Sequence, residues 1–67
     1  MNGKYVRFNG VFLGPVYINP DFITYVSAYN EDPDSPASGV HVIGEKLPII
    51  VKGSPDKVIN DIQEQAR

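Results

Sequence analysis

Apolar and polar residues alternate over residues 4–8, with the period of a half-buried β-strand. Val6 and Phe8 fall on one face of this segment, and Tyr5 and Arg7 fall on the other. A strand whose two faces differ in this way is typical of an antiparallel sheet with one covered face. The pattern predicts a first strand with Val6 and Phe8 in the core.

Asn9-Gly10 follows this strand directly, and the dipeptide readily adopts the two positive φ angles of a type I′ turn. We therefore predict a hairpin whose second strand lies within residues 11–18. Pro15 has no N–H to donate to a ladder, so this strand should be bulged or lie at a sheet edge. Asn19-Pro20-Asp21 then predicts a turn, because proline fixes its φ and both flanking side chains can bond backbone amides.

Residues 22–29 are rich in β-branched and aromatic side chains on both faces, which favours a central strand. The composition changes over residues 30–39, where acids, prolines and small residues predict an exposed loop. Alternation resumes over residues 40–43, and residues 47–51 provide a partner strand. Gly44-Glu45 between them is a candidate type II′ turn, so the pattern predicts a second hairpin.

A helix is predicted from Pro55 to about Gln65. Ser54 can cap the free amides, Pro55 suits the first helical position, and Asp56 lies favourably at the positive end of the helix dipole. Four apolar residues recur at helical spacing and should face the sheet. They are Val58, Ile59, Ile62 and Ala66.

Together these elements predict one small α+β domain over residues 1–67, with the loop 30–39 exposed. Its expected architecture is a four- to five-stranded, mainly antiparallel sheet, made of two hairpins, with the C-terminal helix packed on one face. The apolar strand residues are more numerous than one short helix can cover. This excess predicts a homodimer, formed through paired faces or edges, with domain swapping across the loop 30–39 as a variant.

The composition sharpens the expectation of a partner. A chain of 67 residues is near the lower size limit for independent folding, and it has no cysteine and a single histidine. Disulfides are therefore absent, and a second subunit is the remaining common source of stability. The N-terminal residues lack an apolar signal-peptide core, and no apolar run approaches the length of a membrane span. We expect a cytoplasmic protein with no membrane association.

Three segments contain residue types suited to catalysis or ligand binding, and in each the pattern favours a structural role. His41 falls opposite Val40 and Val42 in the strand alternation, which predicts an ordinary solvent-facing residue rather than a general base. The acids of residues 31–34 lack the spacing of a calcium loop. Ser54 is better explained as a helix cap than as part of a phosphate site. We predict no catalytic residue, metal or cofactor.

The aromatic residues offer a different kind of surface. With Arg7, the tyrosines form a possible interaction surface, which comprises Tyr5, Arg7, Tyr17, Tyr25 and Tyr29. Single-stranded nucleic acids also bind to aromatic platforms, but they need a positive groove. The chain has six basic and eight acidic residues, for a net charge of -2, so nucleic-acid binding is disfavoured. It stays open as an alternative to protein binding.

Four segments carry a family resemblance, namely residues 6–10, 16–23, 51–54 and 58–59. In their order and sequence they resemble the small bacterial flagellar-operon proteins of the FlbD type, which are associated with flagellar or swarming motility. The resemblance implies a motility role and supplies no catalytic residues. From the residues themselves we predict a non-enzymatic interaction or regulatory module, bacterial or encoded by a phage.

Overall fold

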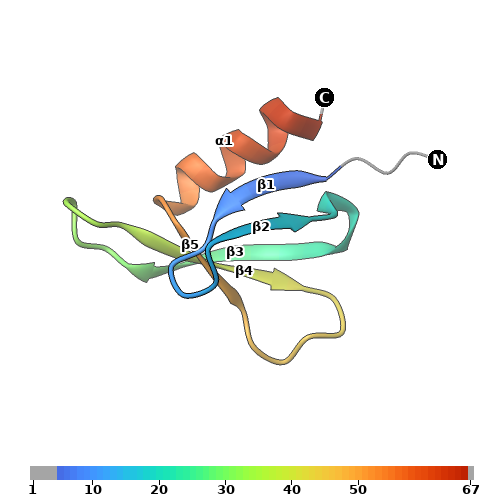
Figure 1. Ribbon diagram of the computed structural model, residues 1–67, viewed down its shortest axis with the longest axis horizontal. Helices are drawn as coiled ribbons and strands as arrows, with labels where there is room; N and C mark the ends of the chain where they lie inside the picture. Colours follow the sequence, from blue (N-terminus) through green and yellow to red (C-terminus); the bar gives the residue numbers. More distant parts are fainter. Residues whose placement is uncertain (1–4, 67) are drawn as a thin grey trace.

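The computed structural model describes residues 5–66, which form five strands, a short 3-10 helix and one α-helix (Figure 1). Lys4, the first residue of the predicted N-terminal strand, lies outside the described residues, as does the beginning of the segment considered for a signal peptide. The elements are β1 (Val6–Asn9), β2 (Pro15–Ile18), η1 (Pro20–Phe22), β3 (Ile23–Asn30), β4 (Ala37–Val42), β5 (Ile49–Lys52) and α1 (Pro55–Ala66).

The strands form two antiparallel sheets, one with the order β1-β2 and the other with the order β3-β4-β5. A single bridge between Gly10 and Val51 joins the end of β1 to β5, and the Val11 amide donates to the Ile50 carbonyl oxygen at 3.0 Å. The predicted α+β class, with antiparallel hairpins and a helix packed on the strands, is confirmed. The strands are divided between two sheets that one bridge connects.

The core lies between the two sheets and beneath the helix, which runs alongside β1 (Figure 1). Val6 and Phe8 are buried and Arg7 is exposed, as the alternation predicts. From the helix, Val58 is buried and Ile62 packs against the core, whereas Ile59 is 42% exposed. The predicted inward stripe is therefore wrong at Ile59, and the side chain of Ala66 lies outside the described part. The fully or nearly buried apolar cluster comprises Val6, Phe8, Ile18, Val40, Val51 and Val58.

Two turns differ from the sequence-based expectation. The first hairpin closes over residues 10–14, where the Gly10 amide donates to the Gly14 carbonyl oxygen at 2.7 Å. Asn9 pairs with Pro15 inside the ladder and no non-glycine residue among those described has a positive φ, so the predicted type I′ turn is wrong. In the second hairpin the Glu45 amide donates to the Val42 carbonyl oxygen. Gly44, with φ 87°, is then the third residue of the turn, which suits type II rather than type II′.

The position of two strands also differs. β3 lies at the edge of its sheet and β4 lies at the centre, so the predicted central role of residues 22–29 is wrong. β4 begins at Ala37, within the segment predicted as an exposed loop. Residues 30–35 are exposed as expected, but Ala37, Ser38 and Gly39 are buried. Small side chains suit a strand flanked on both sides, and their low hydrophobicity concealed it in the sequence.

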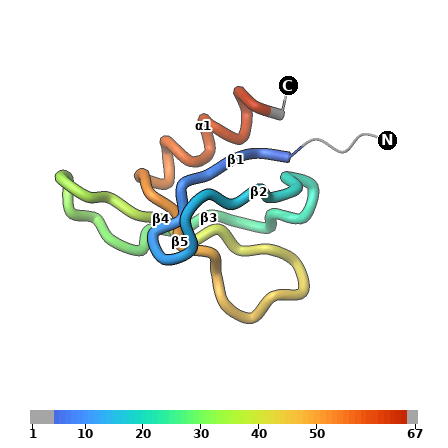
Figure 2. Tube along the Cα trace, viewed as in Figure 1, coloured from blue at the N-terminus to red at the C-terminus, as the bar shows by residue number. Residues whose placement is uncertain are grey.

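The loops 31–36 and 43–48 extend from the body of the protein in different directions (Figure 2). In the second loop, Leu47 is 79% exposed and precedes β5, so the strand predicted over residues 47–51 begins two residues later, at Ile49. The Asn19 side chain accepts the Asp21 amide at 2.9 Å, which confirms the predicted turn. Among the described residues, no helix has the length and apolar character to cross a bilayer.

Candidate functional site on the outward face of the three-stranded sheet

The sheet β3-β4-β5 has one face turned toward the core and one turned away from it. Paired residues in an antiparallel ladder share a face, so the register identifies both faces. Val40 and Val51 lie on the inward face and are fully buried. The other face is here named the outward face. Its ladder residues are Tyr25, Ser27, Asn30, Ala37, Gly39, His41, Ile50 and Lys52. Beside them lie Tyr29, at a register shift of β3, and Val11 and Phe12 of the β1-β2 loop.

His41 is held on this face by two neighbours from β3. Its ring stacks on Tyr25, with ring centroids 3.8 Å apart and an interplanar angle of 12°. Its Nε2 lies 3.0 Å from the Ser27 hydroxyl oxygen. His41 is opposite Val40 and Val42, as predicted, but it is half-buried rather than freely exposed. The cross-strand ring stack and the hydrogen bond stabilise the pairing of β3 with β4.

A serine beside a histidine is the first requirement of a nucleophilic site, because the imidazole can accept the hydroxyl proton. The same mechanism needs a group that orients the histidine and donors that stabilise an oxyanion. Within residues 5–66, no carboxylate hydrogen-bonds to the His41 ring, whose second neighbour is the Tyr25 ring. Ser27 lies in a strand and not on the sharp strand-to-helix turn that exposes a nucleophile. The arrangement is better explained as a structural contact between β3 and β4 than as a catalytic pair.

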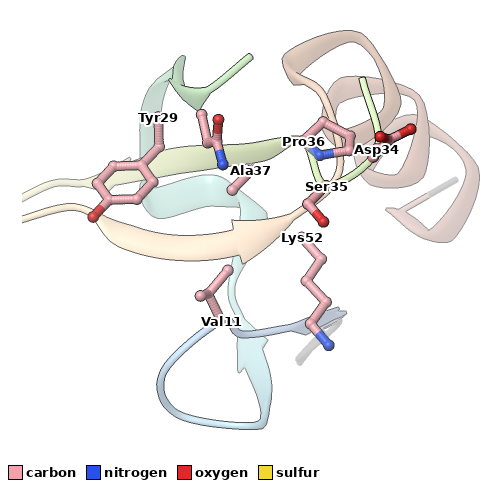
Figure 3. Close-up of a pocket in the computed structure, with 8 residues that line it drawn as sticks. Val11, Tyr29, Asp34, Ser35, Pro36, Ala37 and Lys52 are labelled. Atoms are coloured by element: carbon pink, nitrogen blue, oxygen red, sulfur yellow. The ribbon is translucent and has the colours of Figure 1, made fainter. Parts of the chain in front are cut away.

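A cavity of about 390 Å³ opens at the other end of the outward face (Figure 3). Ala37 lies near its middle, with Tyr29 on one side, Lys52 on the other and Val11 below. Asp34, together with Ser35 and Pro36 of the loop 31–36, completes the wall. The wall thus combines apolar surface with one cationic and one anionic side chain.

Phe12 extends the apolar surface of this face. Its ring contacts Tyr29 edge-on, with centroids 6.4 Å apart and an interplanar angle of 89°. The contact joins the β1-β2 loop to β3, which are in different sheets. Both rings remain open to solvent, with 71% of Phe12 and 59% of Tyr29 exposed. Sequence reasoning missed Phe12, although three successive large apolar residues between Gly10 and Gly14 were a signal for an exposed patch.

The structure divides the predicted tyrosine surface into two groups. Arg7 and Tyr17 are cross-strand partners on the exposed face of β1-β2, and Tyr5 precedes β1 on the same side. Tyr25 and Tyr29 lie on the outward face of the other sheet. The five residues therefore do not form one continuous surface, and each group has its own neighbours.

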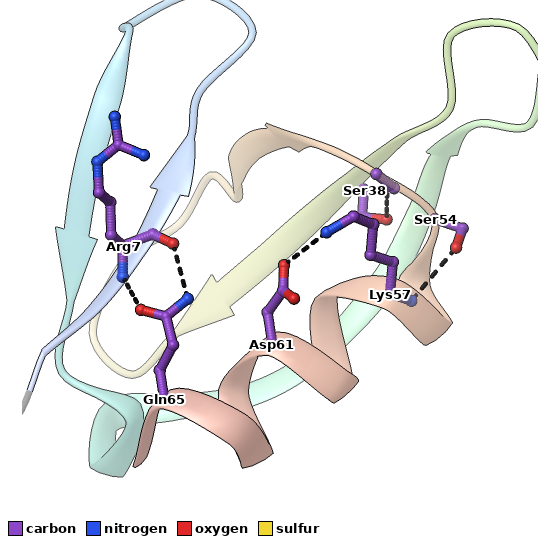
Figure 4. Close-up of polar contacts among 7 residues, drawn as sticks. Arg7, Ser38, Ser54, Lys57, Asp61 and Gln65 are labelled. Atoms are coloured by element: carbon purple, nitrogen blue, oxygen red, sulfur yellow. Dashed lines mark hydrogen bonds and ion pairs between the residues drawn. The ribbon is translucent and has the colours of Figure 1, made fainter.

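The two remaining candidate segments stabilise local structure. In the acidic loop, the Asp32 amide donates to Asn30 Oδ1 at 3.0 Å and the Asp34 amide donates to Asp32 Oδ1 at 2.9 Å. These side chains thus hold the turn of their own backbone. Ser54 Oγ accepts the Lys57 amide at 3.3 Å, which confirms the predicted helix cap (Figure 4). Among the described residues, no group of three or more acidic or histidine side chains is suited to hold a metal ion.

Comparison of the chain with protein-family models, with curated proteins and with solved structures finds no match. The resemblance to flagellar-operon proteins of the FlbD type therefore stays a prediction from the four sequence segments.

Proposed function

We propose that this protein is a non-enzymatic interaction module that forms a homodimer through the outward face. The observation that supports the proposal most directly is the pair of exposed, contacting rings of Phe12 and Tyr29 beside the cavity floored by Ala37. Exposed large aromatic side chains around a concavity are typical of association surfaces.

The energetics of a small chain support a second copy as the occupant. The helix and the strands β1 and β2 pack on the inward face of the three-stranded sheet, whereas the outward face has only partial cover from the β1-β2 loop and Pro48. Burial of apolar surface stabilises by about 25 cal/mol per Å², and one copy leaves Phe12, Tyr25 and Tyr29 largely in water. A stable dimer interface buries roughly 800 Å² on each copy.

The charges around the cavity also suit a symmetric pair. Lys52 and Asp34 lie on its wall together, so the patch carries both signs. In a two-fold dimer the same patch meets itself, and a patch of one sign would repel its copy. A patch with one cation and one anion allows opposite charges to meet across the axis.

The proposal is tested by measuring the mass of the protein by light scattering at micromolar protein concentrations. We expect a two-chain mass for the natural protein and a single-chain mass for the double substitution Phe12→Ser with Tyr29→Ser. Tyr17→Ser removes an equally exposed ring from the other sheet and should leave the dimer intact. Circular dichroism of each variant verifies folding. A single-chain mass for the natural protein would refute dimerisation.

The same variants distinguish the two kinds of dimer that the sequence predicts. In a domain-swapped dimer, strands exchange across the loop 30–39 and each copy keeps the contacts of the single chain. The double substitution at Phe12 and Tyr29 should then leave the two-chain mass unchanged. Loss of the dimer supports pairing of the outward faces, and its persistence contradicts it.

A further inference from the structure

A second cavity, of about 320 Å³, lies between the two sheets, at the end of the protein away from the β1-β2 loop. It is here named the aromatic cleft. Ile18, Val42 and Ile49 form an apolar base, of which Ile18 is buried and the other two are half-buried. The described residues that line it are Tyr5, Tyr17, Ile18, Asn19, Phe22, Val42, Glu45 and Ile49.

Three aromatic rings surround this base, and each comes from a different element. Tyr5 precedes β1, Tyr17 lies in β2, and Phe22 ends the 3-10 helix. More than half of each side chain is exposed, and none of the three rings stacks on another among the described residues. Their surfaces are thus available to a group that enters the cleft.

Among the described residues of the lining, Glu45, from the loop 43–48, is the one carboxylate, and none is a cation. Lys46 follows it in the loop but does not line the cleft. Arg7 is the nearest cation along β1, and its side chain extends toward the β1-β2 loop, away from the end where Tyr5 lies (Figure 4). The cleft therefore presents aromatic rings and a negative charge.

We propose that the aromatic cleft binds an arginine side chain of a partner protein. A guanidinium group is planar and weakly hydrated, so it stacks on aromatic rings and also pairs with a carboxylate. Glu45 supplies that carboxylate. The volume is at the lower end of ligand pockets, which suits one long side chain rather than a cofactor. The net charge of -2 adds attraction toward a basic segment.

This inference goes beyond the proposed dimer and does not depend on it. The aromatic cleft and the outward face share no lining residue. A protein that is monomeric can still bind arginine, and a dimer can fail to bind it. The two proposals therefore succeed or fail separately.

Titration of the ¹⁵N-labelled protein with three probes, monitored by NMR, tests the proposal. The probes are acetyl-arginine amide, acetyl-citrulline amide and acetyl-lysine amide. Citrulline has the shape of arginine without its charge, and lysine has the charge without the planar group. We expect saturable shifts of amides around the cleft with arginine, at a dissociation constant on the order of 1 mM. Citrulline should bind at least about fivefold more weakly, and lysine about threefold more weakly.

Substitutions locate the site. Glu45→Gln should weaken arginine binding about threefold, whereas Glu31→Gln removes the same charge outside the cleft and should not change it. Tyr17→Leu should also weaken it about threefold, because the apolar bulk remains but the aromatic face is lost. Equal binding of citrulline or of lysine overturns the assignment to arginine, as do shifts that cluster away from the cleft or no shifts at all.

Discussion

The two faces of the three-stranded sheet are built from the same strands but have different environments. On the inward face, Val40 and Val51 are fully buried between the hairpin and the helix. On the outward face, Tyr25 pairs with His41 in the ladder and Tyr29 lies at a register shift of β3, and both remain largely exposed. Stability of the single chain therefore depends on the inward face. The outward face, where large aromatic side chains stay exposed, is the surface that we propose for association.

The largest expected difference between the faces is at adjacent residues of β5. Val51→Ala removes a fully buried side chain and should lower the free energy of unfolding by about 2.5 kcal/mol. Ile50→Ala changes a half-buried, outward residue and should cost less than about 1 kcal/mol. Urea denaturation at low protein concentration measures both. Equal losses would mean that the outward face is also part of the single-chain core.

One serine on each face allows the same comparison for hydrogen-bonded polar side chains. Ser38 is fully buried on the inward face, and its hydroxyl donates to the Gly53 carbonyl oxygen at 2.7 Å (Figure 4). Ser38→Ala should cost about 1.5 kcal/mol, because the carbonyl loses a buried partner. Ser27→Ala breaks the half-buried bond to His41 and should cost about 0.5 kcal/mol. Chemical denaturation measures the free energy of unfolding of both variants. A larger loss for Ser27→Ala than for Ser38→Ala would contradict this order.

Gly39 tests how closely the outward face is covered at its centre. A methyl group at this position would lie 3.1 Å from Pro48 Cβ, closer than a normal contact. Gly39→Ala should therefore displace the loop 43–48 and cost about 1 kcal/mol, measured as a lower thermal midpoint. In the double substitution Gly39→Ala with Pro48→Gly, both crowding atoms of the proline ring, Cβ and Cγ, are removed, so the methyl group should cost less than it does beside Pro48. An equal cost of Gly39→Ala in the Pro48→Gly background would contradict the steric explanation.

The smallest expected effect concerns the helix that covers the inward face. Gln65 bonds the backbone of Arg7 twice: the Arg7 amide donates to its Oε1 at 3.0 Å, and its Nε2 donates to the Arg7 carbonyl oxygen at 3.3 Å (Figure 4). Both bonds are exposed, so Gln65→Ala should cost about 0.5 kcal/mol. Gln63→Ala, at a neighbouring exposed position, is the matched control. Hydrogen exchange of the Arg7 amide should accelerate only in the first variant.

Several features set by short-range chemistry were predictable from the sequence, although the types of the two hairpin turns were not. The strand alternation assigned Val6 and Phe8 to the core, and the Ser54 cap located the start of the helix. The Asn19 turn was also predictable, because its side chain bonds an amide two residues away. In each case the residues that determine the structure are close together in the chain.

Features set by distant segments were not predictable. Ala37 and Gly39 resemble loop residues, and they are buried only because β3, β5 and Pro48 surround them. The candidate sites were not predictable from the sequence for the same reason. The pair Phe12 and Tyr29 and the aromatic cleft each bring together segments from different strands, so their geometry depends on how the two sheets are joined.

The connection between the two sheets has a consequence for the kinetics of folding. Within each hairpin, contacts form between residues that are close in sequence, but the bridge from Gly10 to Val51 and the bonds from Arg7 to Gln65, 58 positions later, close long loops. Long loops are entropically costly to close, and chains dominated by such contacts fold slowly. The two hairpins should therefore form first and meet in the rate-limiting step. During synthesis on the ribosome, the backbone of β1 has all its hydrogen-bond partners only after α1 has emerged.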